Sequence, residues 1–257
     1  MDQINEAECL AISPHNKIRE LCVAKKRVST RKSKRQNMDW SAELIRKTYG
    51  FDAVGVVREE DNALILLGIE SGQHRNLDEF ISGHEELENW CFSGIKKHFS
   101  PMVDKLLGDL EKTDPSARPV PAYSGKLPVK ELAVMAGIGV QGRNTLVIND
   151  RSRGCLRFII VTTSIEISPT GTGLYEKHKN HKCDQCRFCE IACPAQVLDE
   201  YRLLNQNQCI AHRQLTNRKP DVERCNICWK ACSKDIEWAE AMRRNKDKLL
   251  RNFLPEY

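Results

Sequence analysis

The amino-acid sequence predicts a chain of two folded parts, an α/β (or α+β) N-terminal domain followed by a smaller cysteine-rich domain. Hydrophobic patterns typical of strands and of helices alternate between positions 51 and 165. Eight of the 12 cysteines then fall between positions 183 and 232. The polar, glycine-containing segment 167–180 separates the two regions and is typical of a linker. These observations predict a first domain at 38–166 and a second at 181–236.

Composition excludes several broad classes of protein. The 257 residues are enough to bury a sizeable core. Forty Lys and Arg against 35 Asp and Glu give a net charge of +5, which does not by itself indicate a nucleic-acid partner. No apolar run is long enough to cross a bilayer, and the first residues lack the pattern of a secretory signal. We therefore expect a cytoplasmic protein with no membrane partner.

The first 37 residues differ from the rest of the chain. The run 25–35 contains seven cations and no acid, and it has little apolar periodicity. Such a run is typical of a solvated tail, and an RNA-contacting arm is the alternative interpretation. We expect 1–37 to be a basic, flexible tail. The first domain then begins with a helix, because Leu44, Ile45 and Tyr49 recur at helical spacing.

The remaining elements of the first domain follow from residue type and spacing. Strand-like patterns occupy 51–57, 63–69, 145–148 and 155–165. Helical spacing occupies 77–110, where Pro101 separates two helices, and the shorter segment 129–135. A Pro-rich loop at 114–121 lies between these helical segments. A charged helix at 237–257 is expected to close the chain.

A glycine motif at 137–142 matches the pattern G-x-G-x-x-G. A dinucleotide fingerprint must follow a strand and open a helix, whereas here a helix precedes the glycines and a strand follows them. We therefore reject a dinucleotide site. The glycines instead indicate either a tight helix-to-strand connection or a backbone that approaches a flat ligand closely.

The cysteines form two sets with metal-ligand spacing. The first set is Cys183-x2-Cys186-x2-Cys189-x3-Cys193-Pro194, and the second is Cys209-x15-Cys225-x2-Cys228-x3-Cys232. The first spacing is that of ferredoxins with two 4Fe–4S clusters, in which the fourth cysteine of a run ligates the other cluster. That rule assigns one cluster to Cys183, Cys186, Cys189 and Cys232, and the other to Cys209, Cys225, Cys228 and Cys193.

Two structural zinc sites are the competing interpretation of these cysteines. Zinc usually takes two separated C-x2-C pairs, and a C-x2-C-x2-C run followed by Cys-Pro favours iron–sulfur clusters instead. The second domain is therefore predicted to be ferredoxin-like with two 4Fe–4S clusters. The four other cysteines lack ligand spacing, and buried or incidental thiols are expected at Cys9, Cys22, Cys91 and Cys155.

The segment 136–146, AGIGVQGRNTL, followed about 40 residues later by the two cysteine sets, resembles the epoxyqueuosine reductase family. The resemblance covers 123–236 and extends more loosely to FDAVG at 51–55. It implies an α/β domain of the cobalamin-reductase type, related to that of the reductive dehalogenases. It also implies a cobalamin between that domain and the clusters, with electrons passing from the clusters to cobalt. The residues that would line the corrin pocket are Gly137, Gly139, Gly142, Arg143, Asn144 and Thr145.

The sequence departs from the family pattern at three places. The family's catalytic Asp falls at Tyr123, which becomes the proton-donor candidate, with a packed aromatic ring as the alternative. Only 25 residues follow Cys232, so the long C-terminal extension that helps the family hold tRNA is not matched, and tRNA is a doubtful partner. Ser233 stands where the family usually has proline. Lys126, Lys130 and Arg143 flank the glycine loop. Solvent-facing charges are the expected role there, and contact with corrin carboxamides or a substrate phosphate is the alternative.

The functional hypothesis is an iron–sulfur oxidoreductase that relays electrons through two clusters, with cobalamin as a candidate cofactor, to reduce an unidentified substrate. An external donor of the ferredoxin or flavodoxin type would supply the electrons. The alternative is a non-catalytic electron-transfer protein of the ferredoxin type that serves a partner enzyme. A third hypothesis is an RNA-associated iron–sulfur protein that uses the basic run 25–35.

Overall fold

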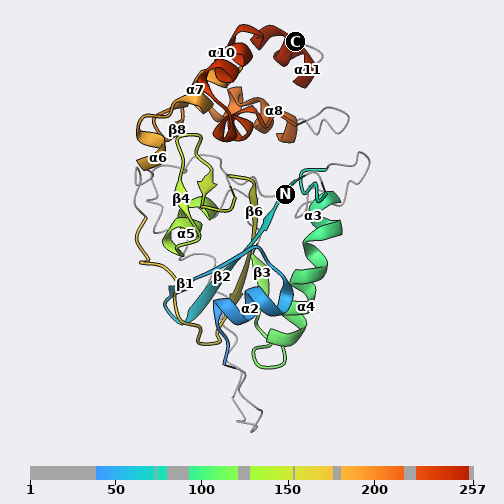
Figure 1. The fold of residues 1–257 in the computed structure, drawn as a ribbon. Coiled ribbons are helices and arrows are strands. Elements are labelled where there is room, and N and C mark those ends of the chain that lie inside the picture. Colours follow the sequence, from blue (N-terminus) through green and yellow to red (C-terminus); the bar gives the residue numbers. More distant parts are fainter. Residues whose placement is uncertain are drawn as a thin grey trace, which may run out of the picture.

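The computed structural model describes residues 39–72, 74–79, 93–120, 128–152, 154–175, 181–216 and 224–254. The basic tail at 1–37, Tyr123, Lys126 and the end of the linker at 176–180 lie outside these described residues. Figure 1 shows a sheet with helices packed beside it and a helical cysteine-rich domain stacked on one end. No helix within the described ranges is long and apolar enough to cross a membrane.

The sheet has four strands in the order β1-β2-β6-β3, and every pairing is antiparallel. The strands are β1 (Ala53–Glu59), β2 (Asn62–Glu70), β6 (Leu156–Thr163) and β3 (Arg118–Val120). Leu66 of β2 lies opposite Ile160 of β6, and seven consecutive residues of β2 are buried. Both faces of the sheet are therefore covered, and the antiparallel pairing makes the domain α+β.

One face of the sheet is covered by α2 (Ala42–Tyr49), α3 (Ser93–His98) and α4 (Ser100–Leu110). Ile65, Leu67 and Ile69 of β2 alternate along the strand to pack into this core, as the pleat requires. Pro101 stands in the first turn of α4, where its missing N–H costs no helical hydrogen bond. The expected division of the helical stretch next to Pro101 is therefore confirmed, whereas the expected helical start at 77 was wrong, because the chain forms a turn at 77–78.

The other face of the sheet is covered by α5 (Val129–Met135) and by the hairpin of β4 (Val140–Gln141) and β5 (Val147–Ile148). Gly55 permits this close packing, because a Cβ there would lie 2.7 Å from the Cβ of Ala136. The strand expected at 145–148 was wrong in its first half. Thr145 has a φ of 64° and closes the hairpin turn, with its N–H donating to Gly142 O at 2.9 Å.

The cysteine-rich domain is built from short helices around its own core. Its elements are α6 (His181–Asp184), α7 (Phe188–Ala192), β7 (Leu198–Asp199), β8 (Arg202–Leu203), η2 (Gln206–Gln208), α8 (Ile210–Thr216), α9 (Ile227–Lys230), η3 (Ala231–Ser233), α10 (Ile236–Arg244) and α11 (Lys246–Phe253). The single closing helix expected at 237–257 was therefore wrong. The helix is interrupted at Asn245, which separates α10 from α11. Ala239 of α10 and Phe253 of α11 both pack into the core of this domain.

The described part of the linker runs along the first domain and bonds to it. Thr170 donates its hydroxyl to Ala136 O at 2.6 Å and accepts from Val56 N at 2.9 Å. Gly173 N donates to Met135 O at 3.1 Å, and the Tyr175 hydroxyl donates to the Gln141 side chain. The segment 167–175 therefore fastens α5 to the edge strand β1.

Asp114 joins the loop after α4 to the end of β6 through hydrogen bonds. Its replacement tests how much this contact stabilises the first domain, called the sheet domain below. Burial alone would raise the pKa of Asp114, but hydrogen bonds from Ser116, Thr163 and Ser164 outweigh it and lower the pKa to about 2. Asp114→Asn should lower the free energy of unfolding by about 2 kcal/mol in urea titrations, since bonds to a charged acceptor are lost.

The pH dependence of this deficit follows from the depressed pKa of Asp114. Its stabilisation is present above the unfolded pKa and is lost only as the pH falls toward the folded pKa of about 2. The deficit of the variant should therefore stay constant between about pH 5 and pH 8. Asp61→Asn, in the exposed turn of the β1–β2 hairpin, is the control and should change stability by less than about 0.5 kcal/mol. A deficit in Asp114→Asn that changes across that pH range would contradict the assignment.

Candidate metal centre

The eight cysteines with ligand spacing are all free thiols in the described residues, and they lie on the short helices and turns of the cysteine-rich domain. Cys189 and Cys193 are buried, and the other six are half-buried. The run from Cys183 to Cys189 turns tightly between α6 and α7, with Cys186 N donating to Cys183 O at 3.1 Å. Cys193 ends α7 in an extended conformation ahead of Pro194. Tight turns of this kind let closely spaced thiols face one centre.

The electrostatic influence of the thiols on one another divides them into two groups that cross between the motifs. Burial raises the pKa of Cys189 to about 12. The charges of the Cys232, Cys186 and Cys183 thiols raise it in the same direction. These four cysteines are called the first thiol set below. The first three of them come from one motif and the last from the other. This grouping is the one that the ferredoxin rule predicts, and the role of these residues as ligands stays a prediction.

The second thiol set consists of Cys193, Cys209, Cys225 and Cys228. Burial raises the pKa of Cys225 to about 12, with the thiols of Cys193 and Cys209 adding to the effect. Burial also raises the pKa of Cys228, and the same three cysteines act on it, as does Cys189 of the first set. The two thiol sets are therefore neighbours. Within the described residues, no three His, Cys, Asp or Glu side chains form a site for a metal ion.

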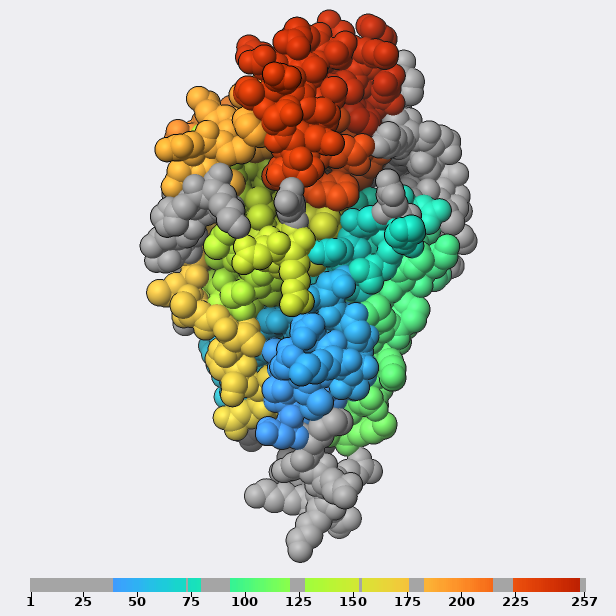
Figure 2. All heavy atoms as spheres, in the orientation of Figure 1, coloured from blue at the N-terminus to red at the C-terminus, as the bar shows by residue number. Residues whose placement is uncertain are grey.

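The turn between β4 and β5 contacts the first thiol set directly, and Figure 2 shows the cysteine-rich domain seated on this end of the sheet domain. Asn144 is 3% exposed, and its Nδ2 donates to Cys232 Sγ at 3.2 Å and to Cys228 O at 3.1 Å. The backbone N–H of Arg143 donates to the thiol of Cys183. Two consecutive residues of the first domain thus reach two sulfurs of one set.

Arg143 also anchors the two domains through its side chain. Its Nε lies 2.7 Å from Glu190 Oε1, and the two side chains are only 9% and 6% exposed. The guanidinium stacks over the ring of Tyr201, 5.5 Å from its centroid. Burial would raise the pKa of Glu190, but its hydrogen bonds from Arg143 and Arg187 outweigh this and lower the pKa. The expectation that Arg143 faces solvent is therefore wrong.

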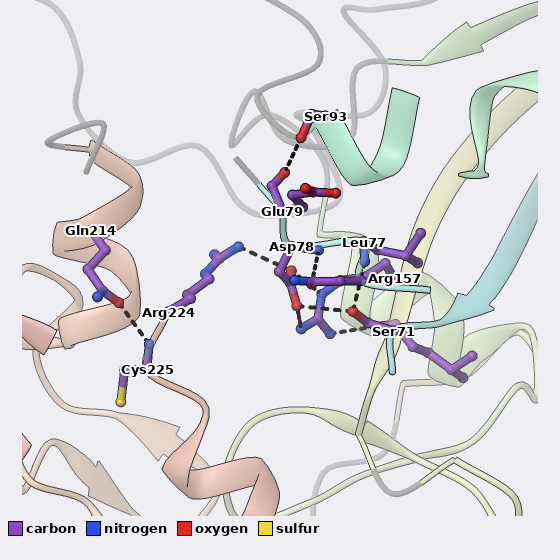
Figure 3. Close-up of polar contacts among 11 residues, drawn as sticks. Ser71, Leu77, Asp78, Glu79, Ser93, Arg157, Gln214, Arg224 and Cys225 are labelled. Atoms are coloured by element: carbon purple, nitrogen blue, oxygen red, sulfur yellow. Dashed lines mark hydrogen bonds and ion pairs between the residues drawn. The ribbon is translucent and has the colours of Figure 1, made fainter. Parts of the chain in front are cut away.

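A second contact between the domains centres on Asp78 (Figure 3). Its carboxylate pairs with Arg157 of β6 at 2.5 Å and with Arg224 at 3.2 Å. Arg224 immediately precedes Cys225, whose N–H donates to Gln214 Oε1 at 2.8 Å. Burial would raise the pKa of Asp78, but the hydrogen bond from Arg157 and the charges of Arg157 and Arg224 lower it. The carboxylate of Asp78 therefore ties the second thiol set to the sheet.

A double-mutant cycle tests this tie. We expect Asp78→Ala and Arg224→Ala to show a coupling energy of about 1 kcal/mol in urea unfolding at pH 7, because each removes the partner of the other. The pair Asp78→Ala and Arg157→Ala should couple at least as strongly, since two hydrogen bonds join these side chains. Independent effects of Asp78→Ala and Arg224→Ala would show that the contact between the domains contributes nothing.

The sequence analysis did not identify Asp78, Arg157 or Arg224 as functional residues. It also did not predict which residues of the cysteine-rich domain the glycine loop contacts. Glu190 carried a usable signal, because it lies inside the cysteine run, next to Cys189. Asp78 and Arg224 carried none, since they are 146 residues apart in the chain.

Close packing and backbone conformation in and beside the hairpin explain why glycine occupies the positions predicted to contact a corrin. A Cβ at Gly139 would lie 2.5 Å from Ile148 O, and one at Gly142 would lie 2.3 Å from Ile148 Cδ1. Gly137 follows α5 with a φ of 69°, a conformation that favours glycine. Thr145 Oγ1 accepts from Lys130 Nζ at 3.3 Å, and the charge of Lys130 acts on the thiols of Cys228 and Cys209. Cofactor binding by the loop stays a prediction.

The chain is similar to known reductases in sequence. No protein-family model matches it. An epoxyqueuosine reductase of Gloeobacter violaceus is 26% identical over 137 residues, which are 48% of this chain and 41% of the relative. A tetrachloroethene reductive dehalogenase of Desulfitobacterium hafniense is 31% identical over 103 residues, 38% of this chain and 18% of the relative. The chain thus spans less than half the length of these curated relatives.

Solved structures of similar fold include epoxyqueuosine reductases. The epoxyqueuosine reductase of Streptococcus thermophilus superposes with a TM-score of 0.50 at 16% identity, covering 74% of this chain and 64% of that one. An epoxyqueuosine reductase crystallised with a stem loop of tRNA-Tyr superposes with a TM-score of 0.50 at 14% identity, covering 82% and 80%. The relatives in sequence and in structure are all reductases. The chain is thus similar to epoxyqueuosine reductases in sequence over about half of its length, and its mixed helix-and-sheet fold is similar to theirs.

Proposed function

We propose that the chain is an iron–sulfur oxidoreductase whose cysteine-rich domain holds two 4Fe–4S clusters. The observation that carries the proposal is the pair of crossed thiol sets, each of which joins three cysteines of one motif to the last cysteine of the other. Four soft thiol donors per set suit an iron–sulfur cluster. The first thiol set would hold one cluster and the second thiol set the other.

The spacing of the cysteines fits two 4Fe–4S clusters better than it fits two zinc ions. Two zinc sites would also use four thiolates each, but a run of C-x2-C-x2-C that ends in Cys-Pro is the spacing of two-cluster ferredoxins. Burial favours the neutral thiol at Cys189 and Cys225, and a bound metal reverses that preference because it coordinates thiolate. Each cluster, when bound, would accept and release one electron at a time.

The residues of the chain hold the two thiol sets against the sheet domain. The Arg143–Glu190 pair and the Asn144 amide fix the first thiol set on the β4–β5 turn. Asp78 and Arg224 fix the second thiol set near β6. This arrangement supports a relay in which a donor of the ferredoxin or flavodoxin type reduces the clusters and the electrons leave toward the sheet domain.

The electron acceptor is the less defined part of the proposal. Cobalamin enters only through the resemblance to epoxyqueuosine reductases and reductive dehalogenases. Gly139 and Gly142 are required by the hairpin itself, so the described loop does not separately indicate a corrin ring. Tyr123 remains the candidate proton donor. A tRNA remains a candidate substrate, because one structure of similar fold contains a tRNA stem loop.

The experiment is a titration of the anaerobically reconstituted chain with cob(II)alamin, followed by absorbance and EPR. A base-off cobalamin spectrum together with about eight irons per chain would support a corrinoid reductase. Phe in place of Tyr123 should then abolish substrate turnover and leave cluster reduction intact. Loss of cluster reduction in that variant would contradict a role confined to proton donation.

An electron carrier of the ferredoxin type is the second candidate function. The observation that favours it is that six of the eight thiols are only half-buried, so clusters held by them would lie near the surface. Unchanged free cobalamin in the same titration, with the full iron content, would favour this carrier over the reductase.

A further inference from the structure

We propose that Asn144 is a positioning residue that raises the reduction potential of the cluster held by the first thiol set. The backbone N–H of Arg143 assists it. This inference rests on the proposed function, because it requires that the first thiol set holds a cluster.

The Asn144 amide has a single orientation in this contact. Its Oδ1 accepts from Leu146 N at 3.1 Å, which leaves the Nδ2 hydrogens for Cys232 Sγ and for Cys228 O. A flipped amide would place Oδ1 against the carbonyl oxygen and the sulfur, and would lose all three bonds. Because Asn144 is 3% exposed, its amide is held by these bonds away from solvent. The N–H···S bond is therefore a fixed feature of the fold.

A second donor acts on the same thiol set from the adjacent residue. The backbone N–H of Arg143 points to Cys183, at the opposite end of the first thiol set in sequence from Cys232. The turn that carries both donors is held by Gly142 N, which donates to Leu146 O at 2.8 Å, and by the Arg143–Glu190 pair. Both donors belong to the sheet domain, and both acceptors belong to the cysteine-rich domain.

Hydrogen bonds to the sulfurs of a cluster change its potential in a defined direction. Reduction adds negative charge, much of it on the sulfurs, so an N–H donor stabilises the reduced state more than the oxidised state. The second thiol set receives N–H donors from its own domain, such as the backbone around Val197 at Cys193. The first thiol set receives donors from the neighbouring domain. Its potential should therefore depend on how the two domains dock.

The test is a redox titration of the full chain, followed by EPR, in variants of Asn144. In Asn144→Ala, the ratio of reduced to oxidised protein for one cluster should fall about tenfold at a fixed solution potential, equivalent to about 59 mV for one electron. Asn144→Asp keeps the acceptor for Leu146 but replaces the donor with a negative charge, so the fall should be larger. The other cluster should shift less, because Asn144 bonds only to the backbone carbonyl of its ligand Cys228 and not to a sulfur of that set.

Asn149→Ala is the matched control. Asn149 lies just after β5 and bonds to Ile138 O, Arg151 N and Ser152 N, all within the sheet domain. Its loss removes a comparable amide without touching a sulfur, so neither cluster should shift. Equal shifts in Asn149→Ala and Asn144→Ala, or unchanged potentials in both Asn144 variants, would overturn the inference while the proposed function stands.

A second measurement covers the case in which the Asn144 variants fail to load iron. The reduced, unmodified chain is labelled with 15N at the asparagine side-chain amides and examined by pulsed EPR. A 15N coupling to one cluster is expected, and its absence would overturn the inference. If the unmodified chain forms no four-iron cluster at all, the proposed function fails first, and the two failures are thereby distinguished.

Discussion

Replacing Cys189 with serine is expected to reduce the reconstituted chain from about eight irons to about four. Cys189 is the most deeply buried member of the first thiol set, and the thiols of Cys232, Cys186 and Cys183 act on it electrostatically. Serine has a similar shape, but its hydroxyl is a poor ligand for a cluster that selects soft thiolates. Iron and acid-labile sulfide analysis, together with EPR of the reduced chain, measures the effect.

The crossed pairing makes this prediction sharper. Cys232→Ser should remove the same EPR signal as Cys189→Ser, although Cys232 lies in the other motif. Cys193→Ser, only four residues from Cys189, should remove the other signal. Opposite assignments would show that each motif binds its own cluster and that the crossed sets are wrong.

Cys155→Ser is the control for the loss of a buried thiol. Cys155 is 8% exposed, as expected of a structural thiol, and belongs to neither thiol set. Its replacement should leave all eight irons in place. Equal iron loss in Cys155→Ser and Cys189→Ser would mean that iron is lost through general destabilisation.

Arg143→Ala is expected to lower the free energy of unfolding by about 3 kcal/mol, because it leaves the carboxylate of Glu190 buried with the exposed Arg187 as its remaining charged partner and the Glu200 N–H as its backbone donor. The variant also loses the stacking on Tyr201. Urea unfolding of the anaerobic protein at pH 7 measures the change. The cysteine-rich domain should also become more sensitive to proteolysis, since the pair joins the two domains.

Arg202→Ala is the matched control for this variant. Arg202 forms an ion pair with Asp199 at 2.8 Å, but its side chain is 66% exposed. Exposed pairs contribute about 0.5 kcal/mol or less, so this variant should unfold nearly as the unmodified chain does. A similar loss in both variants would contradict the structural role of the buried pair.

Much of the fold could be predicted from local patterns. Strands were expected at 51–57 and 63–69, and the structure has β1 and β2 there with ends shifted by one or two residues. The strand at 145–148 failed because Thr145, a β-branched residue, takes a left-handed conformation in the hairpin turn. The turn is stabilised by the hydrogen bond from Thr145 N to Gly142 O, which forms only once the two strands of the hairpin pair. The type of residue at position 145 does not predict it.

The candidate site divides in the same way between local and distant information. Cysteine spacing predicts a crossed grouping by the ferredoxin rule, and the electrostatic partners of Cys189 and Cys228 follow that grouping, while their role as ligands stays a prediction. The contacts of Arg143 and Asn144 were not predictable, because their partners Glu190 and Cys232 lie 47 and 88 residues away. The resemblance directed these two residues toward a corrin, whereas their described contacts are with the cysteine-rich domain.

The most direct test of the central claim is the metal content of the anaerobically reconstituted chain. Iron, sulfide and zinc are quantified together, and the reduced protein is examined by EPR. The account predicts about eight irons and eight sulfides per chain, with signals from two four-iron clusters. Two zinc ions per chain without sulfide, or only a single four-iron cluster, would contradict it.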